Sequence, residues 1–250
     1  MKSTRVIIGG VFAVFLAMGV SPAPALADAD TVETGRLLAI LLDSGRVAIA
    51  GIQPLINDPE KGDKGFTPEV FEESVTAKFK ERAGVDLAKL KTEKVPEQAK
   101  KLLPMLVEAG KKVVATYQPI LNKQGLAYKN FIPATWGTQA AAIFSARTGT
   151  YLKQTTTEEL LRNPKNKADD FEAAALKKFA DPAYPRQGEK VISEAVDGGK
   201  TTRVLLPLFY VKGCLACHGE PKGERDISGY LRDGGKAGDL GGAISVKLTR

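Results

Sequence analysis

The stretch VISEAVDGGKTTRVLLPLFYVKGCLACHG, residues 191–219, decides the fold. Two runs rich in Val, Leu and Thr, at 191–196 and 201–210, flank the turn sequence Asp-Gly-Gly-Lys at 197–200. Branched and aromatic residues on either side of a Gly-rich turn are typical of a β-hairpin. The hairpin leads directly into residues 212–219, where two cysteines and a histidine stand close together. We therefore expect an antiparallel sheet that is followed by a short cysteine-containing turn.

This turn carries the pattern Cys-x-x-Cys-His, formed by Cys214, Cys217 and His218. The pattern is the attachment signature of c-type haem. Two thiols separated by two residues can reach the two vinyl groups on one edge of the porphyrin, and the next histidine then lies under the iron as its proximal ligand. The other ring nitrogen should be held by a backbone carbonyl or by water. The motif thus predicts one covalent haem c.

Three other interpretations of the motif explain less of it. A redox Cys-x-x-Cys pair belongs near the start of a thioredoxin-like βαβ unit, whereas this pair follows a hairpin late in the chain. A disulfide between Cys214 and Cys217 would leave His218 unexplained, and zinc would need a fourth ligand. The motif uses both Cys and the only His of the 250 residues. Chance would produce it with a frequency on the order of 10⁻⁴ in such a chain.

The flanking sequence predicts an α+β fold. Apolar residues recur at helical intervals through residues 28–125, whereas alternating patterns appear in residues 126–250. We expect these two parts to form one folded unit, with helices packed on an antiparallel sheet. Asp30 should cap the first helix, and Pro104 and Gly110 should kink or split the third. The predicted helices cover about 30–56, 67–84, 96–121, 138–145 and 169–180, and the predicted strands cover 149–155, 191–196, 201–210 and 241–248.

Residues 1–27 have the three parts of a secretory signal peptide. Lys2 and Arg5 form a basic start, residues 6–20 are apolar or Gly, and Ala25-Leu26-Ala27 is a small-residue cleavage site. The apolar run is shorter than the roughly 20 residues that a bilayer requires. We predict cleavage after Ala27, a periplasmic location and no membrane span after cleavage. The net charge of +7 comes from scattered lysines, and export argues against a nucleic-acid partner.

Several short motifs occur in order at spacings that resemble a known family. Together with the haem-attachment motif they resemble a family of exported domains with one c-type haem, catalogued as a domain of unknown function. The resemblance implies a PAS-like sheet with helices, haem attachment at Cys214 and Cys217, and proximal ligation by His218. The motifs are Phe-Ile-Pro-Ala at 131–134, Leu-Arg-Asn-Pro-Lys-Asn at 161–166, Asp-Phe-Glu at 170–172 and the closing Gly-Ala-Ile-Ser-Val at 242–246.

The resemblance leaves the sixth iron ligand open. In some members a Cys from the first long helix serves, but the corresponding residues 47–52 contain neither Cys nor His. Met105 is the one Met that remains after signal removal, and it is either a distal ligand or a core side chain. We expect an open, water-bound or weakly ligated distal side.

Haem propionates need cationic or amide partners, and Arg162 and Asn163 are the first candidates. Phe209 and Tyr210 either wall the haem pocket or pack as ordinary strand residues. Further cations that flank the haem segment are Arg203, Lys212, Arg225 and Arg232.

A haem with an open or weakly ligated distal side suits redox sensing, small-ligand sensing or electron transfer. The sequence does not distinguish between these functions. The expected partners are the haem-attachment machinery, a redox or periplasmic signalling protein and a diatomic gas. The alternative is a peroxidase-like oxidoreductase. Peroxidases generally use a distal His as acid–base group, and His218 has no companion, so we expect no enzymatic activity. Class I cytochromes carry the motif near the N-terminus, and four-helix cytochromes lack the hairpin.

Overall fold

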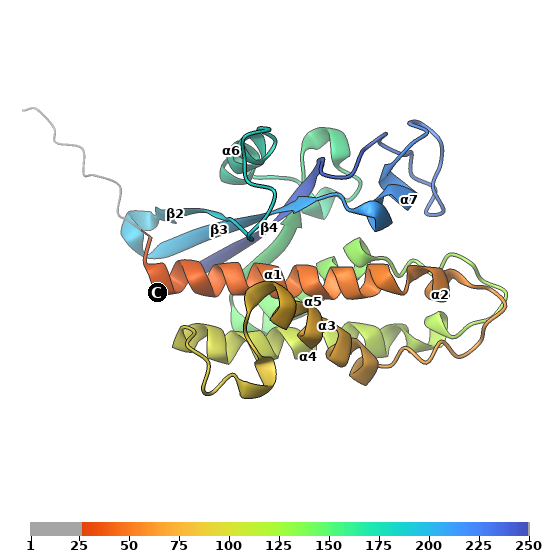
Figure 1. Ribbon diagram of the computed structural model, residues 1–250, viewed down its shortest axis with the longest axis horizontal. Helices are drawn as coiled ribbons and strands as arrows, with labels where there is room; N and C mark the ends of the chain where they lie inside the picture. The colour runs from red at the N-terminus through yellow and green to blue at the C-terminus, as the bar shows by residue number, and fades with distance from the viewer. Residues whose placement is uncertain (1–26, 250) are drawn as a thin grey trace, which may run out of the picture.

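The computed structural model describes residues 27–249, so the predicted signal peptide lies outside the described residues apart from Ala27. Helices and a four-stranded antiparallel sheet form separate layers, which confirms the predicted α+β class (Figure 1). Within the described residues, no helix is both long and apolar enough to cross a membrane. The helices are α1 (Ala29–Gly51), α2 (Gln53–Asn57), α3 (Pro68–Ala83), α4 (Glu97–Leu121), α5 (Pro133–Thr148), α6 (Asp170–Phe179) and α7 (Leu215–His218), and the strands are β1 (Tyr151–Thr155), β2 (Ile192–Val196), β3 (Thr201–Phe209) and β4 (Leu240–Thr249).

The first helix begins at a different cap from the predicted one. The Asp28 carboxylate, not that of Asp30, accepts hydrogen bonds from the backbone N–H and the hydroxyl of Thr31, at 3.0 and 2.7 Å. The helix predicted to run to residue 56 is also divided at Ile52 into α1 and α2. Pro54 explains the division, because it has no amide hydrogen and its ring crowds the carbonyl four residues earlier.

The third helix is not split, because α4 continues through both Pro104 and Gly110. Pro104 is exposed, where water can satisfy the carbonyl that its missing N–H leaves unbonded. Gly110 provides space for Trp136: its carbonyl accepts a hydrogen bond from the indole Nε1–H at 3.2 Å. A Cβ at this position would lie 2.7 Å from the indole ring. By contrast, α3 begins at its predicted cap, Thr67, and ends at Gly84.

The sheet has the strand order β1-β4-β3-β2, and every neighbouring pair is antiparallel. The predicted hairpin is β2 and β3, and the predicted terminal strand is β4. Val204 pairs with Val246, and Leu206 pairs with Ile244. This register places branched apolar side chains of the two central strands on the same face, which α1 covers.

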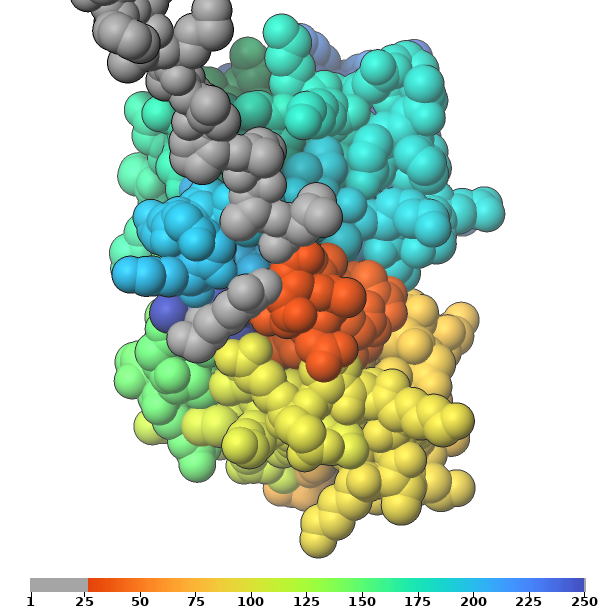
Figure 2. Space-filling model, turned by 90° about the vertical axis from the view of Figure 1, so that its left-hand side faces the viewer, coloured from red at the N-terminus to blue at the C-terminus, as the bar shows by residue number. Residues whose placement is uncertain are grey.

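Both faces of the sheet are covered. Val204 and Leu206 belong to the main core with α1, whereas Leu205 packs in a second core beneath α6. Gly35 allows α1 to approach closely, since a Cβ there would lie 2.7 Å from a Val204 methyl group. Figure 1 shows α1 between the sheet on one side and α3, α4 and α5 on the other. Figure 2 looks along this arrangement and shows the start of α1 (orange-red) between the blue hairpin region and the yellow helical region.

The cysteine motif lies in an excursion between the paired strands β3 and β4. The excursion leaves the sheet at Tyr210 and returns at Asp239, where the Tyr210 N–H donates to the Asp239 carbonyl at 2.8 Å. The Gly238 N–H donates back to the Tyr210 carbonyl, also at 2.8 Å. These bonds close the base of the excursion, so the rigid central strands fix the position of the motif.

Candidate functional site

The structure brings the three residues of the motif together in one short turn. Cys214 ends a 3₁₀ turn, η5 (Lys212–Cys214), and Cys217 and His218 lie in α7, which follows it directly. Both cysteines are free and half-buried. The turn is held by the Cys214 N–H, which donates to the Val211 carbonyl at 2.8 Å. The two thiols and the imidazole therefore come from one short segment that follows β3.

His218 is oriented by a carboxylate and a phenol. Its Nδ1 contacts Oδ2 of Asp233, and the Tyr210 hydroxyl lies 3.1 Å from the same nitrogen. The Tyr210 ring stacks on the imidazole at a centroid distance of 4.9 Å and an interplanar angle of 25°. A carboxylate can only accept hydrogen bonds, so the Nδ1 proton lies between His218 and Asp233. We expected a carbonyl or water in this place; Asp233 takes it instead.

The opposite ring nitrogen of His218, Nε2, has no hydrogen-bond partner among the residues that the structure describes. The His218 side chain is 29% exposed, so this nitrogen can be reached from outside. Burial lowers the pKa of His218, although the hydrogen bond to Asp233 opposes this effect. The neutral imidazole with its proton on Nδ1 presents a lone pair on Nε2, which is the form that binds a metal.

Glycines give Tyr210 and Asp233 their positions. The Gly235 N–H donates to the His218 carbonyl at 2.7 Å, which holds the chain after Asp233 against α7. A Cβ on Gly235 or Gly241 would lie 2.7 or 2.3 Å from the Tyr210 ring. The ring therefore sits between two positions that accept only glycine. The sequence did not indicate which carboxylate would reach the histidine.

Arg162 ties the excursion to the rest of the domain. Its guanidinium lies 2.9 Å from the Asp226 carboxylate and 3.3 Å from that of Asp233. It also donates to the Cys217 and Leu231 carbonyls, at 3.0 and 2.9 Å. Arg162 thus holds the backbone of the motif, a role that the sequence did not indicate. Propionate binding by Arg162 stays a prediction.

The other predicted site residues lie as follows. The Asn163 side chain accepts from the Lys165 N–H at 3.0 Å and caps a 3₁₀ turn, η3 (Pro164–Asn166). Met105 is partly buried against the main core, on α4. Figure 1 places α4 across α1 from the motif. Arg203 pairs with Asp169, the N-cap residue of α6, at 2.7 Å.

The surroundings of Cys217 do not favour a thiolate. Burial raises the pKa of this thiol, and the negative charge of Asp226 raises it further. Reactive and redox-active cysteines have lowered pKa values in electropositive surroundings. Burial and the charge of Asp233 likewise raise the pKa of Tyr210, so its phenol stays a hydrogen-bond donor at neutral pH. Cys217 therefore lacks the lowered pKa that is typical of a redox-active cysteine.

Exposed apolar side chains gather around the motif. Val211 and Leu231 are 58% and 53% exposed, and Ile227 and Tyr230 are nearly as exposed. Most of the large hydrophobic side chains that are exposed in the described chain lie in this one segment. Contiguous exposed apolar surface usually marks a binding site. Two thiols, an imidazole with an available nitrogen and an apolar surround are the features that a covalently attached porphyrin requires, so these residues fit a haem.

The donor atoms do not converge on a single point. In residues 27–249, no group of three or more His, Cys, Asp or Glu side chains is arranged to hold a metal ion.

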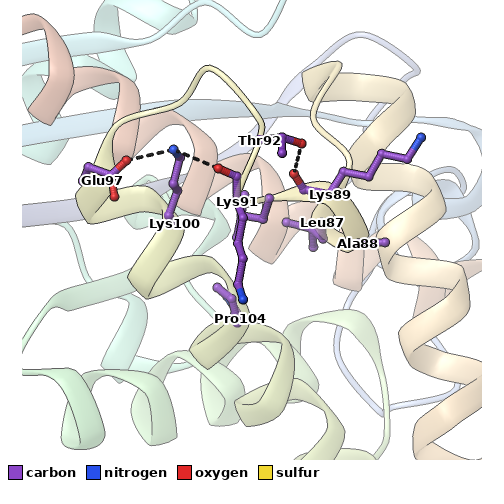
Figure 3. A pocket seen from close by; sticks show the side chains of 9 residues that line it. Leu87, Ala88, Lys89, Lys91, Thr92, Glu97, Lys100 and Pro104 are labelled. Atoms are coloured by element: carbon purple, nitrogen blue, oxygen red, sulfur yellow. Dashed lines mark hydrogen bonds and ion pairs between the residues drawn. The ribbon is translucent and has the colours of Figure 1, made fainter.

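A surface hollow exists elsewhere, in the helical layer. It lies between the 87–92 segment and α4, and Figure 3 shows Lys100 at its edge, bonded to Glu97 at 2.8 Å and to the Lys91 carbonyl at 3.5 Å. None of the predicted site residues lines it. The hollow is therefore separate from the cysteine motif.

Comparison with known proteins identifies the family of this chain. No curated protein matches the sequence. Among solved structures, the crystal structure of the cyanobacterial heme-protein Tll0287 aligns with a TM-score of 0.43 and 16% identity, over 62% of this chain and 96% of that chain. The model of the Tll0287-like family matches residues 88–249, which include the whole sheet and the cysteine motif. The chain therefore belongs to the Tll0287-like family.

Proposed function

We propose that this protein is an exported c-type haem protein with its haem bound to Cys214 and Cys217 and its iron ligated by His218. The orientation of His218 carries the proposal. Asp233 and Tyr210 occupy the Nδ1 side of the ring, and Nε2 is left available beside two free thiols. Membership of a family named after a haem protein supports the same conclusion.

The protein's own residues have distinct roles in this proposal. Cys214 and Cys217 would hold the haem through thioethers, and His218 would ligate the iron through Nε2. Asp233 fixes the tautomer of that histidine. Val211 and Leu231 are exposed and would cover apolar porphyrin surface. The haem itself supplies a one-electron couple and a binding position for a small ligand.

The distal side is proposed to be open or weakly ligated. α1 packs against η5, and Figure 1 shows α7 beside the C-terminal half of α1. This part of α1 carries Val47, which is 37% exposed, and residues 47–52 contain no Cys or His. An open iron would suit redox or small-ligand sensing, whereas an exposed haem edge would suit electron transfer to a protein partner. The PAS-like description of the sheet belongs to this proposal and rests on the antiparallel order β1-β4-β3-β2.

The proposed periplasmic location rests on the predicted signal peptide. The described fold begins with Asp28 as the cap of α1, directly after the predicted cleavage site. Covalent haem attachment outside the cytoplasm would agree with export. The partners proposed are the haem-attachment machinery and a periplasmic redox or signalling protein.

A peroxidase-like activity is the second candidate, favoured by one observation. A carboxylate on the proximal histidine makes the ring a stronger electron donor, which stabilises higher oxidation states of iron. A distal histidine is not available, because His218 is the only one in the chain. We therefore propose a non-enzymatic protein.

The pyridine haemochrome spectrum tests the proposed attachment. Protein produced in the periplasm with a haem-attachment system should give the band position of a haem with both vinyl groups saturated. Cys214→Ala and Cys217→Ala should each give the position of a haem with one vinyl group left, and the double variant should lose its haem on acid–acetone extraction. A spectrum of unmodified haem in the wild-type protein would contradict the proposal.

A further inference from the structure

We propose that Asp233, acting through Nδ1 of His218, lowers the reduction potential of the bound haem, and that Tyr210 limits this effect. The inference rests on the proposed haem ligation by His218. It makes Asp233 and Tyr210 positioning residues that act on the iron through the imidazole, without touching the haem.

The geometry places the carboxylate where it can act on the ligand. Asp233 Oδ2 contacts Nδ1 of His218, and the two side chains are only 16% and 29% exposed. Low exposure limits screening by water, so the ring feels the charge of the carboxylate, although the Arg162 guanidinium, 3.3 Å from Asp233 Oδ1, offsets part of it. The Gly235 N–H bond to the His218 carbonyl, at 2.7 Å, keeps the two residues in this arrangement.

A carboxylate partner changes the electron donation of a histidine ligand. A hydrogen bond from the ring N–H to a carboxylate raises the basicity of the opposite nitrogen. A more basic nitrogen, together with a nearby negative charge, stabilises ferric iron more than ferrous iron. The one-electron reduction of ferric to ferrous haem therefore becomes less favourable, and the potential falls.

Tyr210 competes for the same carboxylate oxygen. Its hydroxyl donates to Asp233 Oδ2 at 3.4 Å, and the ring is held in place by Gly235 and Gly241. A second hydrogen-bond donor on this carboxylate weakens the hydrogen bond that the carboxylate accepts from His218. Removal of the hydroxyl alone should therefore shift the potential in the direction opposite to removal of the carboxylate charge.

The test is a spectroelectrochemical titration of the haem-loaded protein and three variants. Asp233→Asn keeps an acceptor oxygen but removes the charge, and Tyr210→Phe keeps the ring but removes the hydroxyl. Glu220→Gln is the matched control, because this exposed carboxylate lies two residues after His218 and has no bond to the imidazole. Asp233→Asn should favour reduction at least tenfold, which is about 59 mV for one electron. Tyr210→Phe should lower the potential, and Glu220→Gln should leave it almost unchanged.

Equal shifts in Asp233→Asn and Glu220→Gln would overturn the inference, because a general charge effect would then explain them. If Asp233→Asn yields no haem protein, Tyr210→Phe decides alone: a lowered potential supports the inference, and an unchanged or raised one overturns it. Failure of the proposed function is distinguishable, since the wild-type protein would then carry no covalent haem before any potential is measured.

Discussion

Arg162 and Asp226 form an ion pair in which the guanidinium Nη1 lies 2.9 Å from a carboxylate that is completely buried. The two residues are 64 positions apart in the chain. Asp226 also accepts hydrogen bonds from the N–H and hydroxyl of Ser228, at 2.8 and 2.5 Å, which shape the loop behind the motif. The pair therefore connects the loop after β1 to the segment that carries the cysteines.

Loss of this guanidinium should destabilise the protein. Arg162→Gln leaves the buried Asp226 without its counter-charge, and we expect a loss of about 2–4 kcal/mol in the free energy of unfolding. Urea denaturation of the haem-loaded protein measures this change. Arg147→Gln, at an exposed position on α5, is the control and should change stability by less than about 0.5 kcal/mol. Equal stability of the two variants would contradict the role given to Arg162.

The buried carboxylate should also produce a pH dependence. Burial raises the pKa of Asp226, but hydrogen bonds from Ser228 and the charge of Arg162 lower it overall. Because its pKa is lower in the folded state than its unfolded value of about 3.9, its stabilising effect is present above about pH 4 and is lost as pH falls through the folded pKa. Asp226→Asn should be less stable than wild type at pH 7, by about 2–3 kcal/mol. The difference should shrink below pH 4. A difference that stays constant down to pH 2.5 would be inconsistent with this assignment.

Close packing of α1 on α5 predicts a strong effect of one methyl group. A Cβ on Gly45 would lie 2.0 Å from Cη2 of Trp136, which is itself buried. Gly45→Ala should therefore destabilise the protein by about 2–3 kcal/mol through overpacking. Gly51→Ala, in the same helix, meets nothing within 4 Å and should be neutral or slightly stabilising. Thermal unfolding of the two variants provides the comparison, and a stable Gly45→Ala variant would show that the helices can separate at no cost.

An open distal side predicts carbon monoxide binding to the ferrous protein. Met105 packs against the main core, so Met105→Leu should leave the visible spectrum unchanged and alter stability by less than about 1.5 kcal/mol. Spectra of the reduced protein with and without carbon monoxide measure both expectations. A ferric charge-transfer band typical of methionine ligation that disappears in Met105→Leu would instead identify a His/Met electron-transfer centre.

The sequence predicted those helices and strands in which apolar residues recur at regular intervals. The β2–β3 hairpin and β4 follow from alternating apolar residues around a Gly-rich turn. The α6 helix lies where the sequence predicted one, over about 169–180, and the structure adds the capping box of Asp169 and Glu172. The division at Ile52 could also have been inferred from Pro54. The continuity of α4 could not, because Trp136, which occupies the space at Gly110, comes from a different helix.

The residues of the candidate site also fall into two groups: those that the sequence identified and those that only the structure reveals. Cys214, Cys217 and His218 are adjacent in sequence, so their spacing alone identified them. Asp233 reaches His218 through an irregular loop, where no periodic pattern indicates which carboxylate turns inward. The role of Arg162 depends on partners 55 to 71 residues away, and only the folded chain brings them together.

The mass of one tryptic peptide tests the central claim most directly. Cleavage after Lys212 and Lys222 releases residues 213–222, which contain both cysteines and the histidine. For protein isolated from the periplasm of cells that carry a haem-attachment system, we predict this peptide with the mass of one haem added and no thiol left for alkylation. The same peptide without haem, with both thiols open to alkylation, would contradict the account.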